Sequence, residues 1–230
     1  MKFLKRSLNT PTSTSNHVVN LELGLMPIKQ EIDMRKLIFL HHIVSLHDTD
    51  PVKQLYKQQG RFEKEENWHN EIKSLKQYYK IDATENEIKK TNIRKWKEVV
   101  KNKVQTHTLE TLNISCSTQK KAVHLTPYKE IKMQKYMLYM SPEEARILFR
   151  VRSGMLDIKG WRRYKYDDLV CRCCNEDDEE IYHVINKCKS VTREYEIENI
   201  YTLNVNIMKE IVKRITNFFM VMENEGEDEQ

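Results

Sequence analysis

Apolar side chains recur at helical spacing through the first half of the chain. They fall every three or four residues, the spacing that places them on one face of a helix. Asp50 followed by Pro51 is a typical helix start, and Thr84 with Glu87 forms a capping box. We therefore predict helices over 30–47, 52–59 and 68–79, and a further helix that begins at Thr84 and buries Ile93, Trp96, Val100 and Val104.

The helical pattern weakens in the middle of the chain and returns toward the C-terminus. Residues 105–122 are rich in threonine, serine and lysine and have no clear period, which predicts a linker. Ser141 and Glu144, with a proline between them, form a strong helix start, and Gly154 ends that helix. Apolar residues at helical spacing over 205–222 predict an amphipathic C-terminal helix.

Composition favours a mainly α-helical protein with much polar surface. Of 230 residues, 39% are apolar and 32% are charged, while glycine and proline number only five each. Hairpins and glycine-rich phosphate loops therefore lack their usual turn residues. The apolar runs are far shorter than the roughly 20 residues of a transmembrane helix, and the basic first residues are not followed by the apolar core of a signal peptide. We expect an intracellular protein that is neither secreted nor membrane-spanning.

Positive charge gathers in one stretch of the chain. Residues 118–165 carry twelve basic and four acidic side chains, although the whole chain has a net charge of only +5. Basic residues interleaved with aromatic ones suit phosphate contacts and base stacking; the alternative interpretation is a solvated helical face. The candidate nucleic-acid contacts are Lys120, Lys121, Lys135, Arg146, Arg150, Arg152, Arg162 and Arg163, with Trp161 and Tyr164 as stacking residues. Arg152 has a competing structural role, binding carbonyl groups at a helix end.

The sharpest chemical signal is a cluster of metal-ligand residues. Cys171, Cys174, His183 and Cys188 follow the spacing C-x2-C-x8-H-x4-C. Thiolate clusters in an intracellular chain usually indicate a metal, and soft sulfurs with one imidazole suit tetrahedral zinc. Because all four positions are filled by protein ligands, the pattern predicts one structural Zn²⁺.

Three other interpretations of this cluster stay open. Cys173 could replace Cys174 after a change of register. Asp177 and Glu179, in the acidic stretch between the two ligand pairs, could offer oxygen ligands. The cysteines could also be reduced side chains packed as small hydrophobic groups.

These patterns predict five parts along the chain. They are a helical, bundle-like region over 1–104, a linker over 105–122, a basic helix with a zinc knuckle over 123–200, a C-terminal helix over 201–222 and an acidic, disordered tail over 223–230.

Two blocks of the sequence resemble reverse transcriptases of non-LTR (LINE-type) retrotransposons. Residues 20–28 and 35–43 are similar to the segment that follows the polymerase core in those proteins. Residues 145–155 and 165–169, with the Cys-x2-Cys, His and Cys ladder, look like their C-terminal zinc-knuckle region. The resemblance covers about residues 1–195. It implies that the first half is a thumb and post-thumb region, and that the chain grips RNA or DNA near the site of primed reverse transcription.

The catalytic parts of that family have no counterpart in this sequence. Its polymerases need an aromatic-x-Asp-Asp box to hold two divalent metals. The nearest match, Tyr166, Asp167 and Asp168, lacks the intervening residue. No carboxylate and lysine pattern typical of a restriction-like endonuclease follows Cys188. We therefore expect no catalytic residues and no enzyme activity.

Two functions follow as expectations. The first is a non-catalytic fragment of a retrotransposon polyprotein that binds RNA or DNA in the nucleus or cytoplasm. The alternative is a stranded or domesticated zinc module that binds protein partners through the acidic stretch 176–180 and the C-terminal helix. The acidic stretch favours the alternative, because its charge would repel a phosphate backbone.

Overall fold

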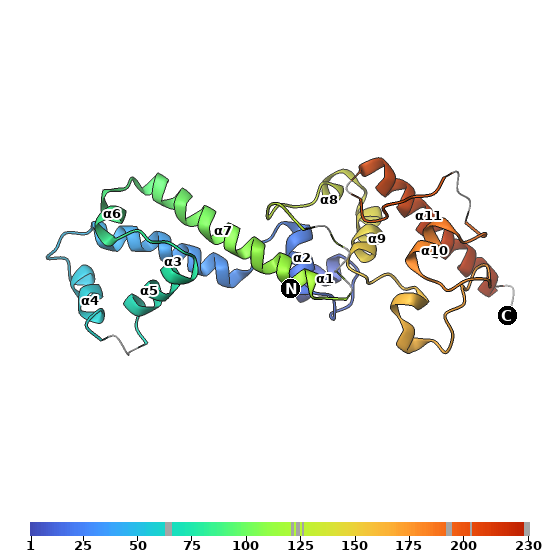
Figure 1. Ribbon diagram of the computed structural model, residues 1–230, viewed down its shortest axis with the longest axis horizontal. Helices are drawn as coiled ribbons and strands as arrows, with labels where there is room; N and C mark the ends of the chain where they lie inside the picture. Colours follow the sequence, from blue (N-terminus) through green and yellow to red (C-terminus); the bar gives the residue numbers. More distant parts are fainter. Residues whose placement is uncertain are drawn as a thin grey trace. The chain divides into compact units, whose positions relative to one another are not determined.

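The protein is almost entirely helical, which confirms the predicted fold class. The computed structural model describes residues 1–62, 66–120, 122, 125, 127–191, 195–202 and 204–227. These residues form eleven α-helices, two short 3-10 helices and two isolated β-bridges, and no β-strand. They divide into two compact units, whose helices are labelled in Figure 1, and each unit has its own apolar core. Among the described residues, we find no helix with both the length and the apolar character of a membrane span.

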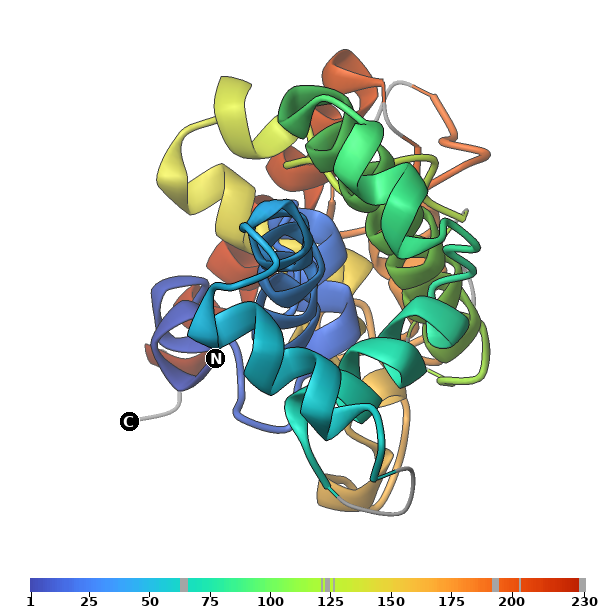
Figure 2. The same ribbon diagram turned by 90° about the vertical axis from the view of Figure 1, so that its left-hand side faces the viewer.

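Unit 2 comprises Met26–Thr111 and Lys129–Ile131. Its helices are α3 (Ile28–Ser45), α4 (Pro51–Gln59), α5 (Trp68–Tyr78), α6 (Glu85–Lys90) and the first part of α7 (Ile93–Ser117). Helices α3 and α7 lie side by side (Figures 1 and 2), and the buried indole N–H of Trp96 donates to the carbonyl of Leu37 over 3.0 Å. The predicted tryptophan and valine stripe of α7 is therefore part of the core of this unit.

The helix starts in unit 2 follow the predicted caps, with one correction. Thr84 and Glu87 form the expected capping box of α6. The helix predicted from Thr84 is two helices, because the helical conformation is interrupted at Thr91 and Asn92, between α6 and α7. The Thr91 hydroxyl donates to the Glu87 carbonyl, and Asn92 Oδ1 accepts the N–H of Arg94 over 2.8 Å. These short polar side chains end one helix and begin the next.

The linker predicted over 105–122 is instead largely helical, because α7 continues through most of it. The buried stripe of α7 extends from Val104 at a spacing of four residues through Thr108, Leu112 and Cys116. The Thr108 hydroxyl donates to the Val104 carbonyl over 2.7 Å, which satisfies the buried oxygen. A threonine in a core position hid the helical period.

Unit 1 comprises Met1–Leu25, Leu112–Tyr128 and Lys132–Gln230. Its helices are α1 (Lys2–Ser7), α2 (Asn16–Leu23), α8 (Tyr136–Tyr139), α9 (Pro142–Arg152), α10 (Ile181–Asn186) and α11 (Val205–Glu227), with the 3-10 turns η1 (Lys159–Trp161) and η2 (Arg163–Lys165). The first 25 residues thus belong with the cysteine-rich lobe, which differs from the predicted boundary at residue 104. Helix α9 begins at the predicted Ser141 capping box.

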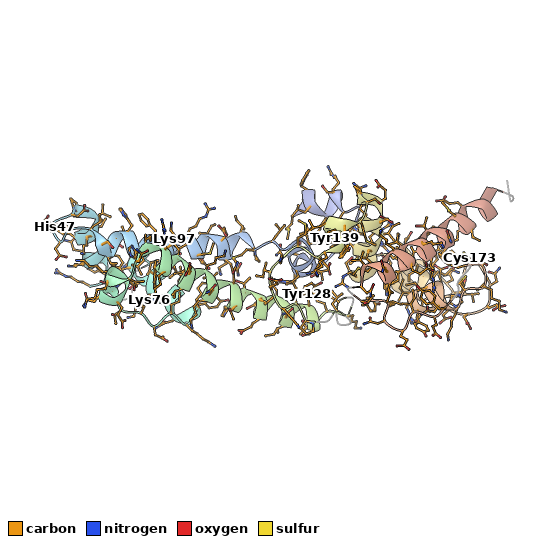
Figure 3. The ribbon with its side chains drawn as sticks, turned by 90° about the horizontal axis from the view of Figure 1, so that it is seen from above. His47, Lys76, Lys97, Tyr128, Tyr139 and Cys173 are labelled. Carbon is orange, nitrogen blue, oxygen red and sulfur yellow. The ribbon has the colours of Figure 1, made fainter. Side chains whose placement is uncertain are left out.

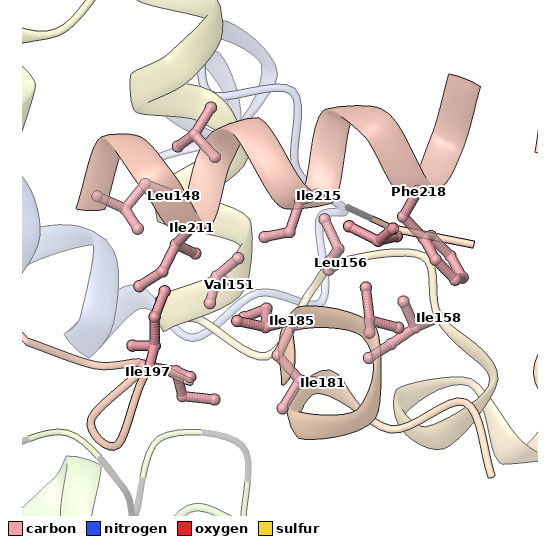
Figure 4. Packing of buried hydrophobic residues seen from close by; sticks show 14 of the residues in the cluster. Leu148, Val151, Leu156, Ile158, Ile181, Ile185, Ile197, Ile211, Ile215 and Phe218 are labelled. Atoms are coloured by element: carbon pink, nitrogen blue, oxygen red, sulfur yellow. The ribbon is translucent and has the colours of Figure 1, made fainter. Parts of the chain in front are cut away.

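The core of unit 1 lies between α9, α10 and α11 (Figure 4). The apolar face of α11 fills it through Ile211, Ile215 and Phe218, so the C-terminal helix is a packed element of this unit. The acidic tail predicted as disordered over 223–230 begins instead inside α11, which runs to Glu227. Val221 and Met222 still pack against the core and hold these last turns. Residues 228–230 lie outside the described part of the chain.

Candidate metal centre

The first two metal-ligand residues lie on a tight turn. An isolated bridge between Val170 and Asp178 brings together the two ends of the loop. The N–H of Cys171 donates to the carbonyl of Asp177 over 2.8 Å, and the N–H of Asn175 donates back to the carbonyl of Cys171 over 3.0 Å. Asn175 adopts a φ of 55°, a left-handed conformation that asparagine tolerates better than most residues. The turn folds the side chains of Cys171 and Cys174 toward one point.

The other two residues lie on α10 and directly after it. His183 is in the helix, and Cys188 follows its end, where the N–H of Cys188 donates to the His183 carbonyl over 2.8 Å. This hydrogen bond closes the last turn and brings the two side chains together. The apolar side of α10, with Ile181 and Ile185, packs into the core of unit 1 (Figure 4), which anchors the helix beside the turn.

The four ligand atoms lie close enough together to share one metal ion. They all lie within 4.8 Å of one another. The Sγ atoms of Cys171 and Cys188 are 3.8 Å apart, and Cys174 Sγ lies 3.3 Å from Nε2 of His183. Zinc–sulfur bonds of about 2.3 Å at tetrahedral angles place two sulfurs about 3.8 Å apart. Cys171, Cys174, His183 and Cys188 can therefore hold one metal ion, as their spacing predicted.

Cys173 is not part of this cluster, because its side chain points toward α11. The thiol of this residue, labelled in Figure 3, lies 3.4 Å from the carbonyl of Phe218 on α11, which it contacts as a hydrogen-bond donor. Its own carbonyl accepts from the Ser190 hydroxyl over 3.0 Å. Cys173 thus ties the metal loop to α11, and Cys174 is the residue that faces the cluster.

The two acidic residues considered as oxygen ligands have other roles. Glu179 is fully buried and accepts hydrogen bonds from the backbone N–H groups of Lys159 and Arg172 and from the guanidinium of Arg172. It therefore braces the loop from inside. Asp177 lies 3.6 Å from Nδ1 of His183, on the far side of the ring from Cys174. This distance is too long for a hydrogen bond, and Nδ1 of His183 has no hydrogen-bond partner among the described residues, so Asp177 places a negative charge near the ring without fixing its orientation.

The protonation of these groups depends on their burial. Burial raises the pKa of the Cys171 and Cys188 thiols, and it lowers the pKa of His183, although Asp177 opposes that second shift. Burial alone would also raise the pKa of Cys174, but hydrogen bonds from the N–H of Glu176 and from the Cys171 thiol lower it overall. A neutral imidazole is the form that binds metal, and the buried thiols must release protons to a bound cation.

The acidic stretch 176–180 is partly neutralised by nearby bases. Glu176 pairs with Lys189 at 2.6 Å and Glu180 with Arg163 at 2.8 Å. Glu179 pairs with Arg172, as described above. Three of the five acids are therefore paired with bases of the same lobe, which reduces their repulsion of a phosphate backbone.

The predicted nucleic-acid residues differ in exposure, and several are engaged by other residues of the chain. Lys120, Lys135, Arg163 and Tyr164 are exposed, with Arg163 held by Glu180. Lys121 lies outside the described residues. Arg146 donates to the carbonyl of Ser7, Arg150 is partly buried, Arg162 pairs with Asp157 at 3.4 Å, and Trp161 packs against the core.

Arg152 is a correction to the sequence prediction, because only 4% of its side chain is exposed. Its Nε donates to Glu22 over 2.8 Å, and Nη1 donates to the carbonyl of Tyr201 over 2.9 Å. Tyr128 and Tyr136 also donate to the Glu22 carboxylate. The sequence analysis missed Glu22, whose signal is a single acid between buried apolar residues of α2.

The chain has no detected similarity to known proteins. Comparisons with protein-family models, curated proteins and solved structures found no match to the chain. The site's own geometry is therefore the basis for any functional conclusion.

Proposed function

We propose that this chain is a non-catalytic, nucleic-acid-binding part of a retrotransposon-type reverse transcriptase polyprotein. In this proposal one structural zinc ion holds the cysteine-rich lobe, and basic side chains contact RNA or DNA. The protein acts inside the cell, in the nucleus or cytoplasm, where thiols stay reduced and available to metal. The observation that carries the proposal is the convergence of three thiols and one imidazole on a single point.

The donor set supports zinc and a structural role for it. Three sulfurs and one imidazole nitrogen favour zinc over the hard cations, which prefer oxygen. Cys171, Cys174, His183 and Cys188 would supply all four bonds, so the arrangement reserves no coordination position for water or substrate. A bound zinc ion would link the turn at Cys171 to α10. The backbone hydrogen bonds of the turn and of the end of α10 hold the ligand residues in place.

The charge arrangement supports contact with nucleic acid. Lys120 and Lys135 are exposed on unit 1 and can approach phosphates. Tyr164 is 75% exposed, so its ring is accessible for stacking against a base. Pairing of three of the five acids in the stretch 176–180 with bases reduces the electrostatic objection.

The protein-interaction alternative has less support. Its two proposed surfaces, the acidic stretch 176–180 and the C-terminal helix, are both engaged within unit 1. The acids pair with Arg163, Arg172 and Lys189, and the apolar face of α11 fills the core. We therefore treat binding to protein alone as a possible outcome of the test.

The experiment is fluorescence anisotropy of labelled RNA and DNA strands with the zinc-loaded chain at several salt concentrations. We expect binding that weakens with salt, and a log–log slope that decreases by about 0.7–0.9 for each phosphate-contacting lysine or arginine replaced. A double variant, Lys120→Gln with Lys135→Gln, tests whether these two lysines of unit 1 contact phosphates. Binding whose affinity does not change with salt concentration would contradict the proposal. So would a chain that binds no RNA or DNA strand but recovers protein partners after nuclease treatment.

A further inference from the structure

Unit 2 contains a pocket that the sequence analysis did not identify. It has a volume of about 450 Å³ and lies between the end of α5 and the middle of α7. Its lining includes Lys80, Asn102, Lys103, His107 and Glu110. All of these residues belong to unit 2, so the pocket is separate from the candidate metal centre.

Two lysines give the pocket a positive rim. Lys80 and Lys103 are exposed, and among the described residues neither is paired with a carboxylate. Some lysines of this unit are already engaged, namely Lys36 with Glu71, Lys57 with Asp48, and Lys76, labelled in Figure 3, with the carbonyl of Ala83. The two rim lysines are therefore available to an anion.

The backbone holds Lys80 firmly at this rim. The N–H of Ile81 donates to the carbonyl of Lys76 over 2.8 Å, and the N–H of Lys80 donates to Gln77 over 3.1 Å. This pair of bonds is a Schellman motif, and its left-handed position is usually a glycine. Here the position is Lys80, with a φ of 54°. A lysine in this conformation has a conformational cost that glycine would avoid.

Two ring side chains, Tyr79 and His107, line the pocket, and Tyr78 contacts both of them. The ring centroid of His107 lies 4.3 Å from that of Tyr78 and 5.4 Å from that of Tyr79. Tyr79 is buried, and its hydroxyl is fixed by Asp33 at 2.8 Å. The ring of Tyr78 is tilted by 51° from that of His107, and the ring of Tyr79 by 80°, so His107 is the ring that a base can pack against beside the two lysines.

We propose that this pocket binds one nucleotide of a single-stranded nucleic acid. The base would pack against His107, and the flanking phosphates would contact Lys80 and Lys103. Asn102 and Glu110 supply polar groups for the edge of the base. A single strand is required because a paired base is not free to leave its stack and enter a pocket. The inference rests on the proposed function and adds a contact in unit 2, outside the basic segment 118–165.

Binding of a fluorescein-labelled single-stranded DNA and of its duplex form, measured by anisotropy across a salt series, tests this inference. Replacing both lysines (Lys80→Gln, Lys103→Gln) should lower the log–log salt slope for the single strand by about 1.4. His107→Ala should weaken binding about tenfold without changing the slope. Lys57→Gln is the matched control, because its amino group already pairs with Asp48, and it should bind as the wild type does.

Lys80→Gly separates binding from folding. Glycine suits the left-handed position, so this variant should melt at or above the wild-type temperature while its salt slope falls by about 0.7. If the wild type binds the single strand but the double lysine variant keeps the wild-type slope, the pocket inference is wrong and the proposed function stands. If the wild type binds no strand at low salt, both are wrong.

Discussion

Arg152 and Glu22 lie 130 residues apart in the sequence and form a salt bridge of 2.8 Å in the interior of unit 1. Only 4% of the arginine side chain and none of the glutamate side chain is exposed. The Glu22 carboxylate raises the pKa of Arg152 above its usual value, although burial opposes that shift. The pair connects α2 to α9 and explains why the first 25 residues fold with the cysteine-rich lobe.

Arg152→Met should therefore destabilise unit 1 severely. The change leaves the Glu22 carboxylate buried without its cation, and loss of one partner of a buried pair typically costs about 3–5 kcal/mol. Adding Glu22→Gln should restore much of this stability, because the remaining buried charge is removed. Urea unfolding of the single and double variants measures the effect.

Arg163→Met provides the matched control for this cycle. Arg163 pairs with Glu180 at 2.8 Å, but both side chains are more than half exposed. Removal of such a surface pair typically changes stability by less than about 1 kcal/mol. An Arg152→Met protein as stable as the Arg163→Met protein would show that the buried pair does not hold unit 1.

Acid should weaken unit 2 through Asp48. Hydrogen bonds from Lys53 and Lys57 hold the pKa of Asp48 at about 2, below its usual 3.8. A carboxylate with a lowered folded-state pKa contributes stability above its unfolded pKa, and that contribution is lost as the pH falls through the folded value. We expect the wild-type melting temperature to fall between about pH 4 and pH 2.

Asp48→Asn isolates this contribution. The variant should lose less stability than the wild type over the same acid range, because it has no carboxylate at this position to protonate. Lys53 should keep its hydrogen bonds to the carbonyls of Val44 and Leu46 at 3.0 and 2.8 Å in both proteins. Identical acid dependence of the two melting temperatures would contradict the assignment.

Helix ends and metal ligands were predictable from the sequence because both are local. The Ser141 and Thr84 capping boxes depend on residues three positions apart, and their predicted helix starts are confirmed. The metal ligands could be named from spacing, since a turn and one short helix bring them together. Spacing could not choose between Cys173 and Cys174, which differ only in the direction of the side chain.

Long-range relationships could not be predicted in the same way. Nothing near Glu22 in the sequence indicates that Arg152 neutralises it, so the sequence predicts nucleic acid or helix-end carbonyl groups as the partners of this arginine. The pocket beside α7 combines the end of one helix with the middle of another, and its rim lysine depends on a backbone conformation that side-chain patterns do not encode. The stripe through Thr108 is not visible as an apolar pattern, because threonine counts as a polar residue in the sequence. It can still be buried here, since its hydroxyl donates to the helix backbone.

Metal removal should unfold one part of the chain selectively. The core of unit 1 includes Cys171 and Cys188, whereas the core of unit 2 contains no cysteine among its described members. Zinc binding contributes on the order of 10 kcal/mol to small lobes of this type. After chelation, we expect amide NMR signals of α10 and the Cys171 turn to lose their dispersion while the Trp96 indole signal of unit 2 is retained. Unchanged signals from α10 would contradict a structural role for the metal.

The most direct test of the account is the zinc content of three purified proteins, measured by elemental analysis. The wild type and Cys173→Ser should each hold one zinc per chain, because the Cys173 thiol faces the carbonyl of Phe218. Cys174→Ser should lose the metal, because its thiol lies 3.3 Å from His183 within the ligand cluster. Absence of zinc from the wild type, or equal zinc in the two variants, would contradict the proposed site.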